Sequence, residues 1–283
     1  MAEINAQMIV KLRQMTNAGM MDCKRALLET NGDLDAAVDL LRKKGMATAA
    51  KKAAREAREG GIAQFILPDS RAGVLVEVNC ETDFVAKNEM FRSFADEVAK
   101  TLAENPAADL EALRTDAIAR LRENIQIARH ERLEVQGNGL VAAYIHTGAK
   151  VGVLVEVGAG KAETAANDQF RQFVKDITLQ IAAGSPVAVT REELDPAIIE
   201  REKEVYENSD AVKNKPPQAV ESIIKGKLEK FLQGICLVDQ GFVKRNSEVS
   251  VREHLGEVAR EIGDEITIRR FVRFQVGEVI AAK

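Results

Sequence analysis

The chain reads Gly73-Val74-Leu75-Val76-Glu77-Val78 and repeats the same six letters as Gly152-Val153-Leu154-Val155-Glu156-Val157. The spacing of 79 positions, without a gap, also pairs two phenylalanines of each copy: Phe91 and Phe94, Phe170 and Phe173. Valine-rich runs of this length are typical of strands, and aromatic residues three apart are typical of the buried face of a helix. The sequence therefore predicts two related units, each a sheet covered by a helix.

Each copy is expected to open with a β-hairpin. Strands at residues 62–67 and 73–79 flank the turn Pro68-Asp69-Ser70, and strands at 140–146 and 151–157 flank the turn Thr147-Gly148-Ala149. Proline, glycine and short polar residues favour such turns. Hairpins followed by helices predict an α+β fold class.

Further along, the spacing between the copies grows from 79 to 141 residues, because the strand that begins at Ile125 matches the one that begins at Ile266. The second copy therefore carries an insertion, expected at about residues 187–246. Its apolar positions form two narrow seams: Leu194, Ile198 and Val205, then Val220, Ile224, Leu228 and Phe231. The stretch from Lys213 through Asn214 to Pro217 would turn between them, which predicts a projecting helical (coiled-coil) hairpin whose second helix starts at proline.

Residues 1–45 read as a bundle of three short helices. Asn5 can cap the first, whose apolar positions are Met8, Leu12 and Met15, and the second and third follow the breaks at residues 16–19 and 31–33. Alanine alternating with lysine and arginine at 46–60 lacks an apolar stripe and predicts a solvated helical linker.

The expected domains are a helical module at 1–45, the linker at 46–60, a first α+β subdomain at 61–138 and a second at 139–283.

Composition restricts the function. The chain has 283 residues, a net charge of -4, no membrane-length apolar run and, from Met1 on, no signal-peptide pattern. Cys23, Cys80 and Cys236 are odd in number and widely spaced, which predicts reduced thiols in the cytoplasm.

The three histidines, His130, His146 and His254, form no catalytic or metal-binding motif, and His254 is expected to be exposed. We therefore expect no enzyme, no catalytic residue, no metal and no cofactor.

A ribosome- or RNA-binding protein that does not exchange nucleotide is the alternative class. The stretches 43–58 and Arg269-Arg270-Phe271-Val272-Arg273 are basic, but Glu56 and Glu59 adjoin or interrupt the first and the second alternates like a half-exposed strand. A solvated charged face is the favoured interpretation, and no direct nucleic-acid partner is expected.

The two copies disagree directly after the repeated strand. The first continues through Asp83 and Phe84, where the second has Ala162 and Glu163. Since the second copy lacks the aromatic residue, the scaffold does not need it. Phe84 could pack into a local core or stand exposed as a wedge of the kind that forms interface hot spots. Asp83 could cap the following helix or pair with a group of a partner.

Three long strings resemble the elongation factor Ts family across almost the whole chain. They are Ala18-Gly19-Met20-Met21-Asp22-Cys23-Lys24-Arg25-Ala26-Leu27, Glu77-Val78-Asn79-Cys80-Glu81-Thr82-Asp83-Phe84-Val85-Ala86, and Tyr144-Ile145-His146 running into Val151-Gly152-Val153-Leu154. The resemblance implies a guanine-nucleotide exchange factor that binds the GTPase elongation factor Tu, with or without GDP, and acts in translation elongation.

The resemblance also implies residue roles. The N-terminal module would be similar to ubiquitin-associated bundles and would dock through Arg13, Met20 and Met21, although one of the two methionines is expected to face the bundle interior. Thr82, Asp83, Phe84 and Val85 match the segment that dislocates Mg²⁺ in the partner, and His146 matches a residue that contacts it.

The assembly remains open, since a dimer of two such heterodimers is compatible with the resemblance. Some members extend into a further C-terminal helix. This chain runs only to Lys283, so we expect the contact from that helix to be absent or reduced.

Overall fold

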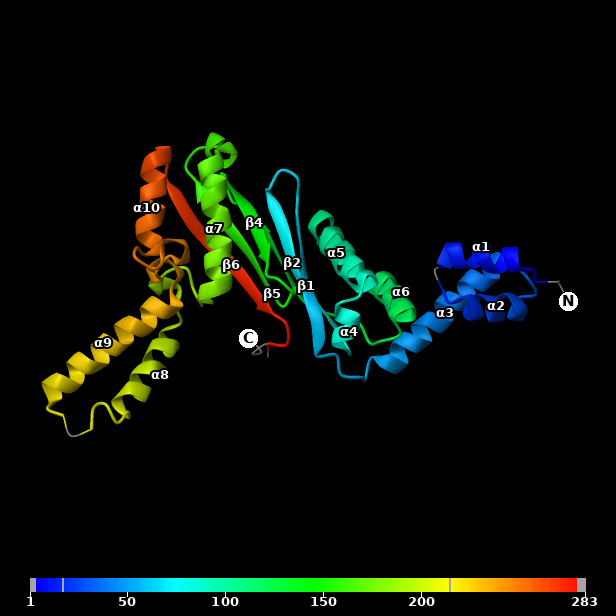
Figure 1. The fold of residues 1–283 in the computed structure, drawn as a ribbon, viewed down its shortest axis with the longest axis horizontal. Helices are drawn as coiled ribbons and strands as arrows, with labels where there is room; N and C mark the ends of the chain where they lie inside the picture. The colour runs from blue at the N-terminus through cyan, green and yellow to red at the C-terminus, as the bar shows by residue number, and fades with distance from the viewer. Residues whose placement is uncertain (1–3, 17, 214, 279–283) are drawn as a thin grey trace.

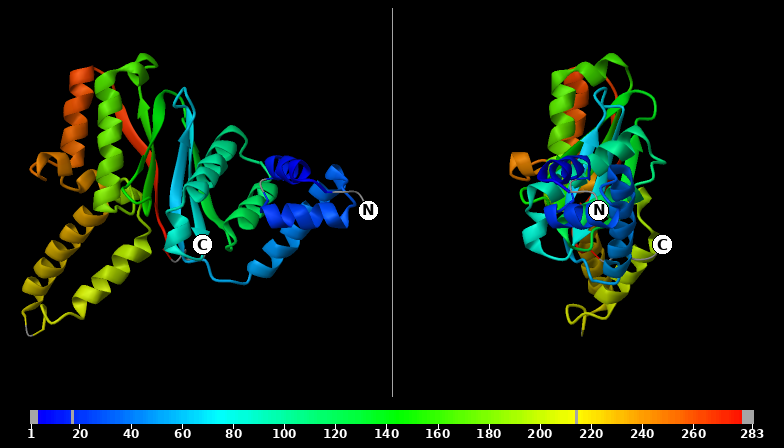
Figure 2. Two further views of the ribbon diagram at one scale, coloured as in Figure 1. Left: turned by 45° about the vertical axis from the view of Figure 1, so that its right-hand side comes forward. Right: turned by 90° about the vertical axis from the view of Figure 1, so that its right-hand side faces the viewer.

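The computed structural model describes residues 4–16, 18–213 and 215–278. It shows an α+β fold: N-terminal helices, then two antiparallel sheets of three strands each within the described residues. The molecule is elongated, with the N-terminal helices at one end and a helical hairpin projecting at the other (Figure 1). In the middle, the two sheets face each other and helices cover both outer faces (Figure 2).

The N-terminal helices are α1 (Ala6–Thr16), α2 (Met20–Glu29) and α3 (Leu34–Lys52). Asn5 caps the first as expected, since its Oδ1 accepts the Met8 N–H at 2.9 Å. The buried centre of the bundle consists of small and branched residues: Leu12, Cys23, Ala26, Leu27 and Ala37. Of the apolar positions that predicted the first helix, Leu12 is buried and Met15 is exposed. The predicted break at residues 16–19 includes Asn17, which lies outside the described residues.

The third helix is longer than its apolar pattern predicted, because α3 runs through the first half of the expected linker. Ala49 is buried against the core of the first sheet subdomain, and the Lys52 ammonium donates to the Arg122 carbonyl. Residues 46–52 are therefore a helix end that docks through Ala49, a buried contact that the predicted solvated helical linker did not include, whereas their other side chains are exposed or half-buried. Alanine gives no apolar stripe, but its small side chain allows helices to approach closely.

The first copy consists of two strands, three helices and a final strand. Its elements are β1 (Glu59–Ile66), β2 (Ala72–Cys80), α4 (Asp83–Ala86), α5 (Glu89–Glu104), α6 (Glu111–Leu121) and β3 (Gln126–Glu134). Phe91 and Phe94 on α5 are buried beneath the sheet, as predicted.

The second copy follows the same order around its insertion. Its elements are β4 (Gly139–Ile145), β5 (Val151–Ala159), the 3-10 turn η1 (Glu163–Ala166), α7 (Asp168–Gly184), α10 (Val251–Ile262) and β6 (Ile266–Gln275). Phe170 and Phe173 are buried on α7. The strand register shifts between Glu77 and Val78 in one copy and between Glu156 and Val157 in the other, so the repeat extends to this irregularity.

The insertion forms helices α8 (Pro196–Glu207) and α9 (Pro217–Ile235). Pro217 starts the second helix, as predicted, whereas Asn214 of the predicted turn lies outside the described residues. The seams are only partly buried: Ile224 is covered but Val205 is exposed, so its prediction as a packed position was wrong. Leu194 is buried at the root of the hairpin, against Ala188 and Cys236.

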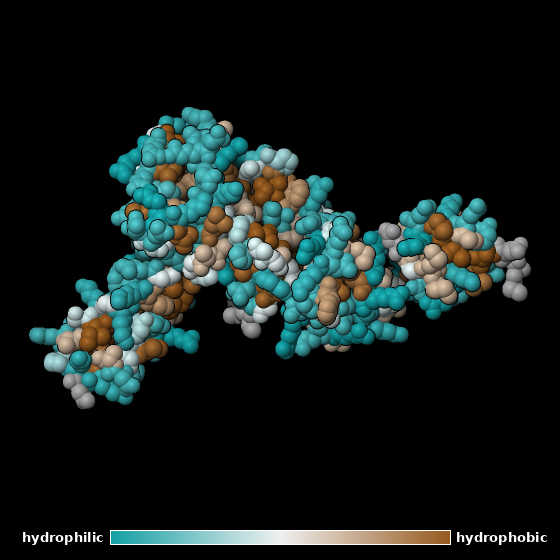
Figure 3. All heavy atoms as spheres, viewed as in Figure 1, coloured by the Kyte–Doolittle hydropathy of each residue, from teal (hydrophilic) through white to brown (hydrophobic). Residues whose placement is uncertain are grey.

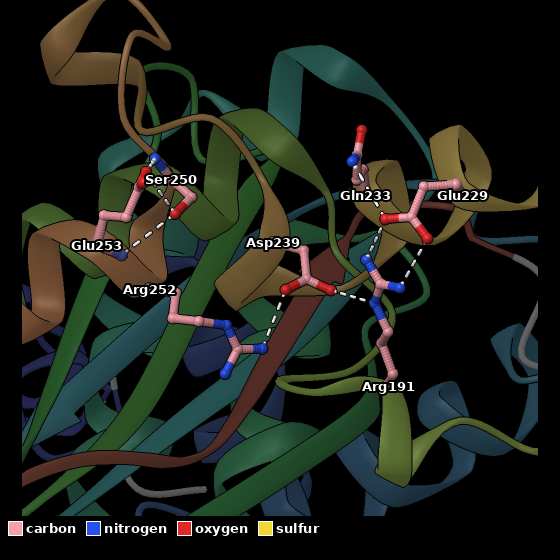
Figure 4. A network of polar contacts seen from close by, with 7 residues as sticks. All are labelled: Arg191, Glu229, Gln233, Asp239, Ser250, Arg252 and Glu253. Atoms are coloured by element: carbon pink, nitrogen blue, oxygen red, sulfur yellow. Dashed lines mark hydrogen bonds and ion pairs between the residues drawn. The ribbon is translucent and has the colours of Figure 1, made fainter. Parts of the chain in front are cut away.

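An ion-pair network fixes this root. Arg191 of the 3-10 turn η2 (Arg191–Glu193) donates to both oxygens of Glu229 at 2.9 and 2.7 Å, and pairs with Asp239 of η3 (Leu237–Asp239) (Figure 4). Arg252 on α10 donates to the other Asp239 oxygen at 3.0 Å. The following 3-10 turn is η4 (Val243–Arg245). Bidentate arginine–carboxylate pairs have defined geometry, so they set the direction in which the hairpin leaves the subdomain.

The two sheets share an apolar layer to which both copies contribute: Ile62, Leu75, Leu133 and Val135 from the first, and Val141, Leu154 and Phe274 from the second. Glycine at the first repeat position permits this approach. A Cβ at Gly73 would overlap Ile66, and one at Gly152 would overlap Ile62 of the other copy.

Backbone hydrogen bonds cross between the copies in reciprocal pairs. The Ile62 N–H donates to the Ala149 carbonyl, and the Val141 N–H donates to the Ser70 carbonyl, both at 2.8 Å. Ile62 and Val141 are equivalent at the 79-residue spacing, and so are Ser70 and Ala149, so the two hydrogen bonds are equivalent as well. The copies are therefore related as two halves of a local two-fold arrangement.

Candidate functional site

The turn after β2 presents the segment in which the copies differ. Thr82 has extended backbone angles and its Oγ1 accepts the Val85 N–H at 3.3 Å, so Thr82 is the N-cap of α4. Asp83 is the first residue inside this helix. The interpretation of Asp83 as the cap was therefore wrong, because the threonine before it occupies the position whose side chain faces the free N–H groups.

Phe84 points into solvent on this short helix, with 81% of its surface exposed. The alternative in which it packs into a local core is therefore excluded. Val85, the next residue, packs instead against the core of the first subdomain. An apolar ring that gains nothing from its own fold is available for a pocket in another protein.

The Asp83 carboxylate accepts a hydrogen bond from the Lys87 Nζ at 2.7 Å, one helical turn further on. This contact lowers the pKa of Asp83 below its ordinary value. Asp83 is therefore ionised at neutral pH, and the pair is exposed enough for a cation of a partner to compete with Lys87.

The N-terminal module presents a second apolar surface. Met20 and Met21 are 50% and 65% exposed, so the expectation that one of them faces the interior was wrong. The core contacts of α2 come from Cys23, Ala26 and Leu27, and this leaves the first turn outside the bundle. Arg13 is exposed in the last turn of α1. Figure 3 shows brown and tan atoms gathered among hydrophilic ones at this end of the molecule.

His146 lies in the exposed turn between β4 and β5, and its Nδ1 is 3.0 Å from the Tyr144 hydroxyl. This turn approaches the end of β2 that leads into residues 82–85, because Lys150 pairs with Glu59 at 2.6 Å and Glu59 lies opposite Cys80 in the sheet. Cys80 in turn donates to the Thr82 carbonyl at 3.2 Å. The structure thus brings the segment 82–85 and the His146 turn to the same edge.

The linker and the N-terminal module also contact the first subdomain near residues 81–82. The Arg55 guanidinium pairs with Glu81 at 3.5 Å. The backbone carbonyl of Arg55 accepts a hydrogen bond from the Asn124 side-chain amide at 2.7 Å. Arg122 also lies 3.8 Å from Asp22 on α2. Met20 and Met21 themselves make no part of these contacts, so they remain a separate patch within the described structure.

Glu123 is a site residue that the sequence did not reveal. Its carboxylate contacts the backbone just ahead of Asp83, although the two residues are 40 positions apart. In the sequence, Glu123 is distinguished only by its match to Asp264 at the 141-residue spacing. Acidic residues coincide too often in two copies for such a match to identify a site.

His254 takes no part in the site. It was expected to be exposed, but the structure shows it half-buried. Its ring stacks on Phe242, with centroids 4.3 Å apart, because α10 packs over the loop that carries Phe242. The three cysteines are buried free thiols, and burial raises the pKa of Cys80 to about 12.

Among the residues that the structure describes, no group of three or more His, Cys, Asp or Glu could hold a metal ion. No helix of the described chain has the length and apolar character needed to cross a membrane.

Comparison of the sequence with known proteins shows the family to which the chain belongs. A family model described as Elongation factor TS matches residues 81–278, which include the segment 82–85 and the second copy with its insertion. Elongation factor Ts of Symbiobacterium thermophilum is 45% identical, with 99% of this chain and 94% of the relative covered. The proteins of the same name from Lawsonia intracellularis and Nitratidesulfovibrio vulgaris are 41% and 42% identical, covering 97% and 99% of this chain and 99% and 98% of the relatives. The chain therefore belongs to the elongation factor Ts family of translation factors.

Proposed function

We propose that this chain is a guanine-nucleotide exchange factor that binds elongation factor Tu in its GDP-bound and nucleotide-free forms and promotes GDP release. The observation that carries the proposal is the exposed Phe84 beside the ionised Asp83, on a helix end that the second copy lacks. The factor carries out no chemical step of its own and acts in the cytoplasm, without a cofactor.

The physical task explains the residue types. Mg²⁺ requires near-octahedral oxygen ligands and bridges a GTPase to the phosphates of its nucleotide. A rigid ring inserted close to this site displaces the segments that hold the ion, and a neighbouring carboxylate can attract a cationic group of the partner. On this proposal Thr82, Asp83, Phe84 and Val85 form the Mg²⁺-dislocating wedge.

Exchange follows from linkage. A factor that binds the empty GTPase more tightly than the loaded one weakens nucleotide binding by the same ratio. Burying one phenylalanine contributes about 1.5–3 kcal/mol, or roughly one to two decades in an equilibrium constant. Phe84 alone is therefore insufficient for a large acceleration, and other surfaces must hold it in place.

Those surfaces are the remaining modules. Residues 1–45 would dock as a ubiquitin-associated-like bundle through Arg13, Met20 and Met21, whose exposure supports adaptable apolar contact. His146 would add a contact from the second subdomain. The hairpin α8–α9 would serve as a coiled-coil arm of the same binder.

The RNA-binding alternative is disfavoured because two arginines of its basic strand, β6, are engaged in contacts within the chain. Arg269 and Arg270 both donate to the buried Glu156, at 2.9 and 2.7 Å. Guanidinium groups held in this way are not free for phosphate.

The proposal is tested by release of a fluorescent GDP analogue from purified elongation factor Tu, with and without this chain. Acceleration that saturates with the concentration of the chain is expected. If release is unchanged while the two proteins still bind, the chain is a non-exchanging binder. A salt-sensitive shift of labelled RNA in place of binding would favour the alternative.

A further inference from the structure

The turn that carries the wedge is held by one carboxylate from elsewhere in the chain. One Glu123 oxygen accepts the backbone N–H groups of Glu81 and Thr82, at 2.9 and 3.0 Å. The other oxygen accepts the Thr82 hydroxyl at 2.6 Å. Both oxygens of Glu123 are therefore used on the two residues that precede Asp83 and Phe84.

The contact is reciprocal. The Glu81 carboxylate accepts the Asn124 N–H at 2.7 Å, so the segments 81–82 and 123–124 hold each other. Asn124 is fully buried and its side-chain amide donates to the Arg55 carbonyl at 2.7 Å. These contacts fix the loop between α6 and β3, and Glu123 holds the turn at residues 81–82 in position relative to that loop.

The Phe84 ring is exposed, so its position follows from the backbone of α4, which is a single turn. Val85 anchors this turn in the core of the first subdomain, and Thr82, which Glu123 holds, caps its start. The orientation of the ring therefore depends on the orientation of Thr82 as well as on the packing of Val85. A group that is presented in its binding geometry loses less conformational freedom when it enters a pocket.

We propose that Glu123 is a positioning residue for nucleotide exchange, whose carboxylate holds the Thr82 cap so that Asp83 and Phe84 face the partner in one orientation. The inference rests on the proposed exchange function and deepens it. Glu123 does not need to touch the partner, because it acts through Thr82.

The second copy contains a matched clamp without a wedge. Asp264 accepts the Lys161 N–H at 3.0 Å and the Thr164 hydroxyl at 2.6 Å, and so holds the turn that leads into η1. In each copy the acid follows a left-handed residue that ends a helix, Arg122 with φ 59° and Gly263 with φ 71°. The clamp is thus a feature of both scaffolds, but only the first one supports an exposed aromatic ring.

The test compares Glu123→Gln with Asp264→Asn in the full chain. Each variant keeps size and removes charge, and thermal unfolding monitors the fold of both. Release of the fluorescent GDP analogue is measured over a range of chain concentrations, to separate the maximal rate from the half-saturating concentration. We expect Glu123→Gln to lower the maximal rate roughly tenfold, the loss typical of one hydrogen bond to a charged group, while half-saturation stays within about twofold. Asp264→Asn should change neither.

Hydrogen exchange supplies a local measurement that a general loss of stability would not reproduce. The amides of Glu81 and Thr82 should exchange faster in Glu123→Gln, while those of the α5 core remain protected. Thr82→Val is a second variant, which removes the hydroxyl that joins Glu123 to the cap of α4 and should also lower the maximal rate. If Glu123→Gln lowers the yield of folded chain, Thr82→Val carries the test.

The outcomes separate the two proposals. A wild-type chain that leaves GDP release unchanged refutes the exchange function itself. A wild-type chain that accelerates release, with Glu123→Gln equal to it or with Asp264→Asn equally impaired, overturns the positioning role and leaves the exchange function in place.

Discussion

The two copies have the same scaffold and different turns. Strands β2 and β5 share their six letters, and in both copies an acid just after the last helix of the copy, Glu123 or Asp264, clamps the turn that follows the shared strand. The first turn then leads into α4 with an exposed Phe84, whereas the second leads into η1 with Glu163 at the equivalent position. The comparison separates what the fold requires from what the turn adds.

The largest effect is expected where the copies agree. Phe91→Ala and Phe170→Ala remove rings that are equally buried, so each should destabilise the chain by about 3–5 kcal/mol. Urea unfolding followed by circular dichroism measures this. A much smaller cost in one copy would show that the repeated helices are not energetically equivalent.

The next effect concerns the position where they disagree. Phe84→Ala should slow maximal GDP release roughly tenfold to a hundredfold, because an inserted ring is lost. Pull-down with elongation factor Tu should persist, and stability should be unchanged since the ring is exposed.

Glu163→Phe is the reciprocal change, and it should add nothing to the rate. A doubled rate in this variant would contradict a single wedge and would mean that the second turn also reaches the nucleotide site.

A smaller effect is expected at a buried acid that both copies share. Burial raises the pKa of Glu156, but the Gln136 N–H and the guanidinium groups of Arg269 and Arg270 outweigh it, so the pKa lies below its ordinary value. Glu156→Gln should therefore cost about 1.5 kcal/mol at pH 7.

The lowered pKa of Glu156 fixes the direction in which its contribution to stability changes with pH. Because the folded state favours the charged form, the stabilisation is present above the ordinary carboxylate pKa and is lost as pH falls through the lower folded pKa. The gap between wild type and Glu156→Gln should close in that acidic range. A gap that widens on acidification would rule out the ion pairs as its origin.

The smallest effect is expected at the surface pair of the first turn. Lys87→Ala removes the contact that lowers the pKa of Asp83, so this pKa should rise toward its ordinary value. An NMR titration of the side-chain carboxyl measures the change. The second copy has alanine at both equivalent positions, Ala162 and Ala166, so the scaffold should tolerate the loss.

The repeat made most of the fold predictable. Buried periodic residues such as Phe91 and Phe170 mark the helices, and the change in spacing locates the insertion, because both signals reflect burial that any sequence must satisfy. The docked end of α3 was not predictable, since Ala49 contacts a core that follows later in the chain.

The site was predictable as a segment but not in its geometry. The difference between the copies pointed to Asp83 and Phe84, yet the choice of Thr82 as cap depends on backbone angles that the letters do not contain. Met20 and Met21 were misjudged because hydrophobicity does not say which turn of a short helix faces outward. Glu123 was missed because its contact is long-range.

The reciprocal bonds between Ile62 and Ala149 and between Val141 and Ser70 have the pattern of a symmetric dimer interface, here closed within one chain. In a dimer of identical subunits, every substitution appears twice, so a wedge on one subunit would be matched by a wedge on the other. Joining the halves covalently removes that constraint. One half can present Phe84 while the other presents Glu163 and carries the hairpin, so the two halves of the pair expose different groups at equivalent positions.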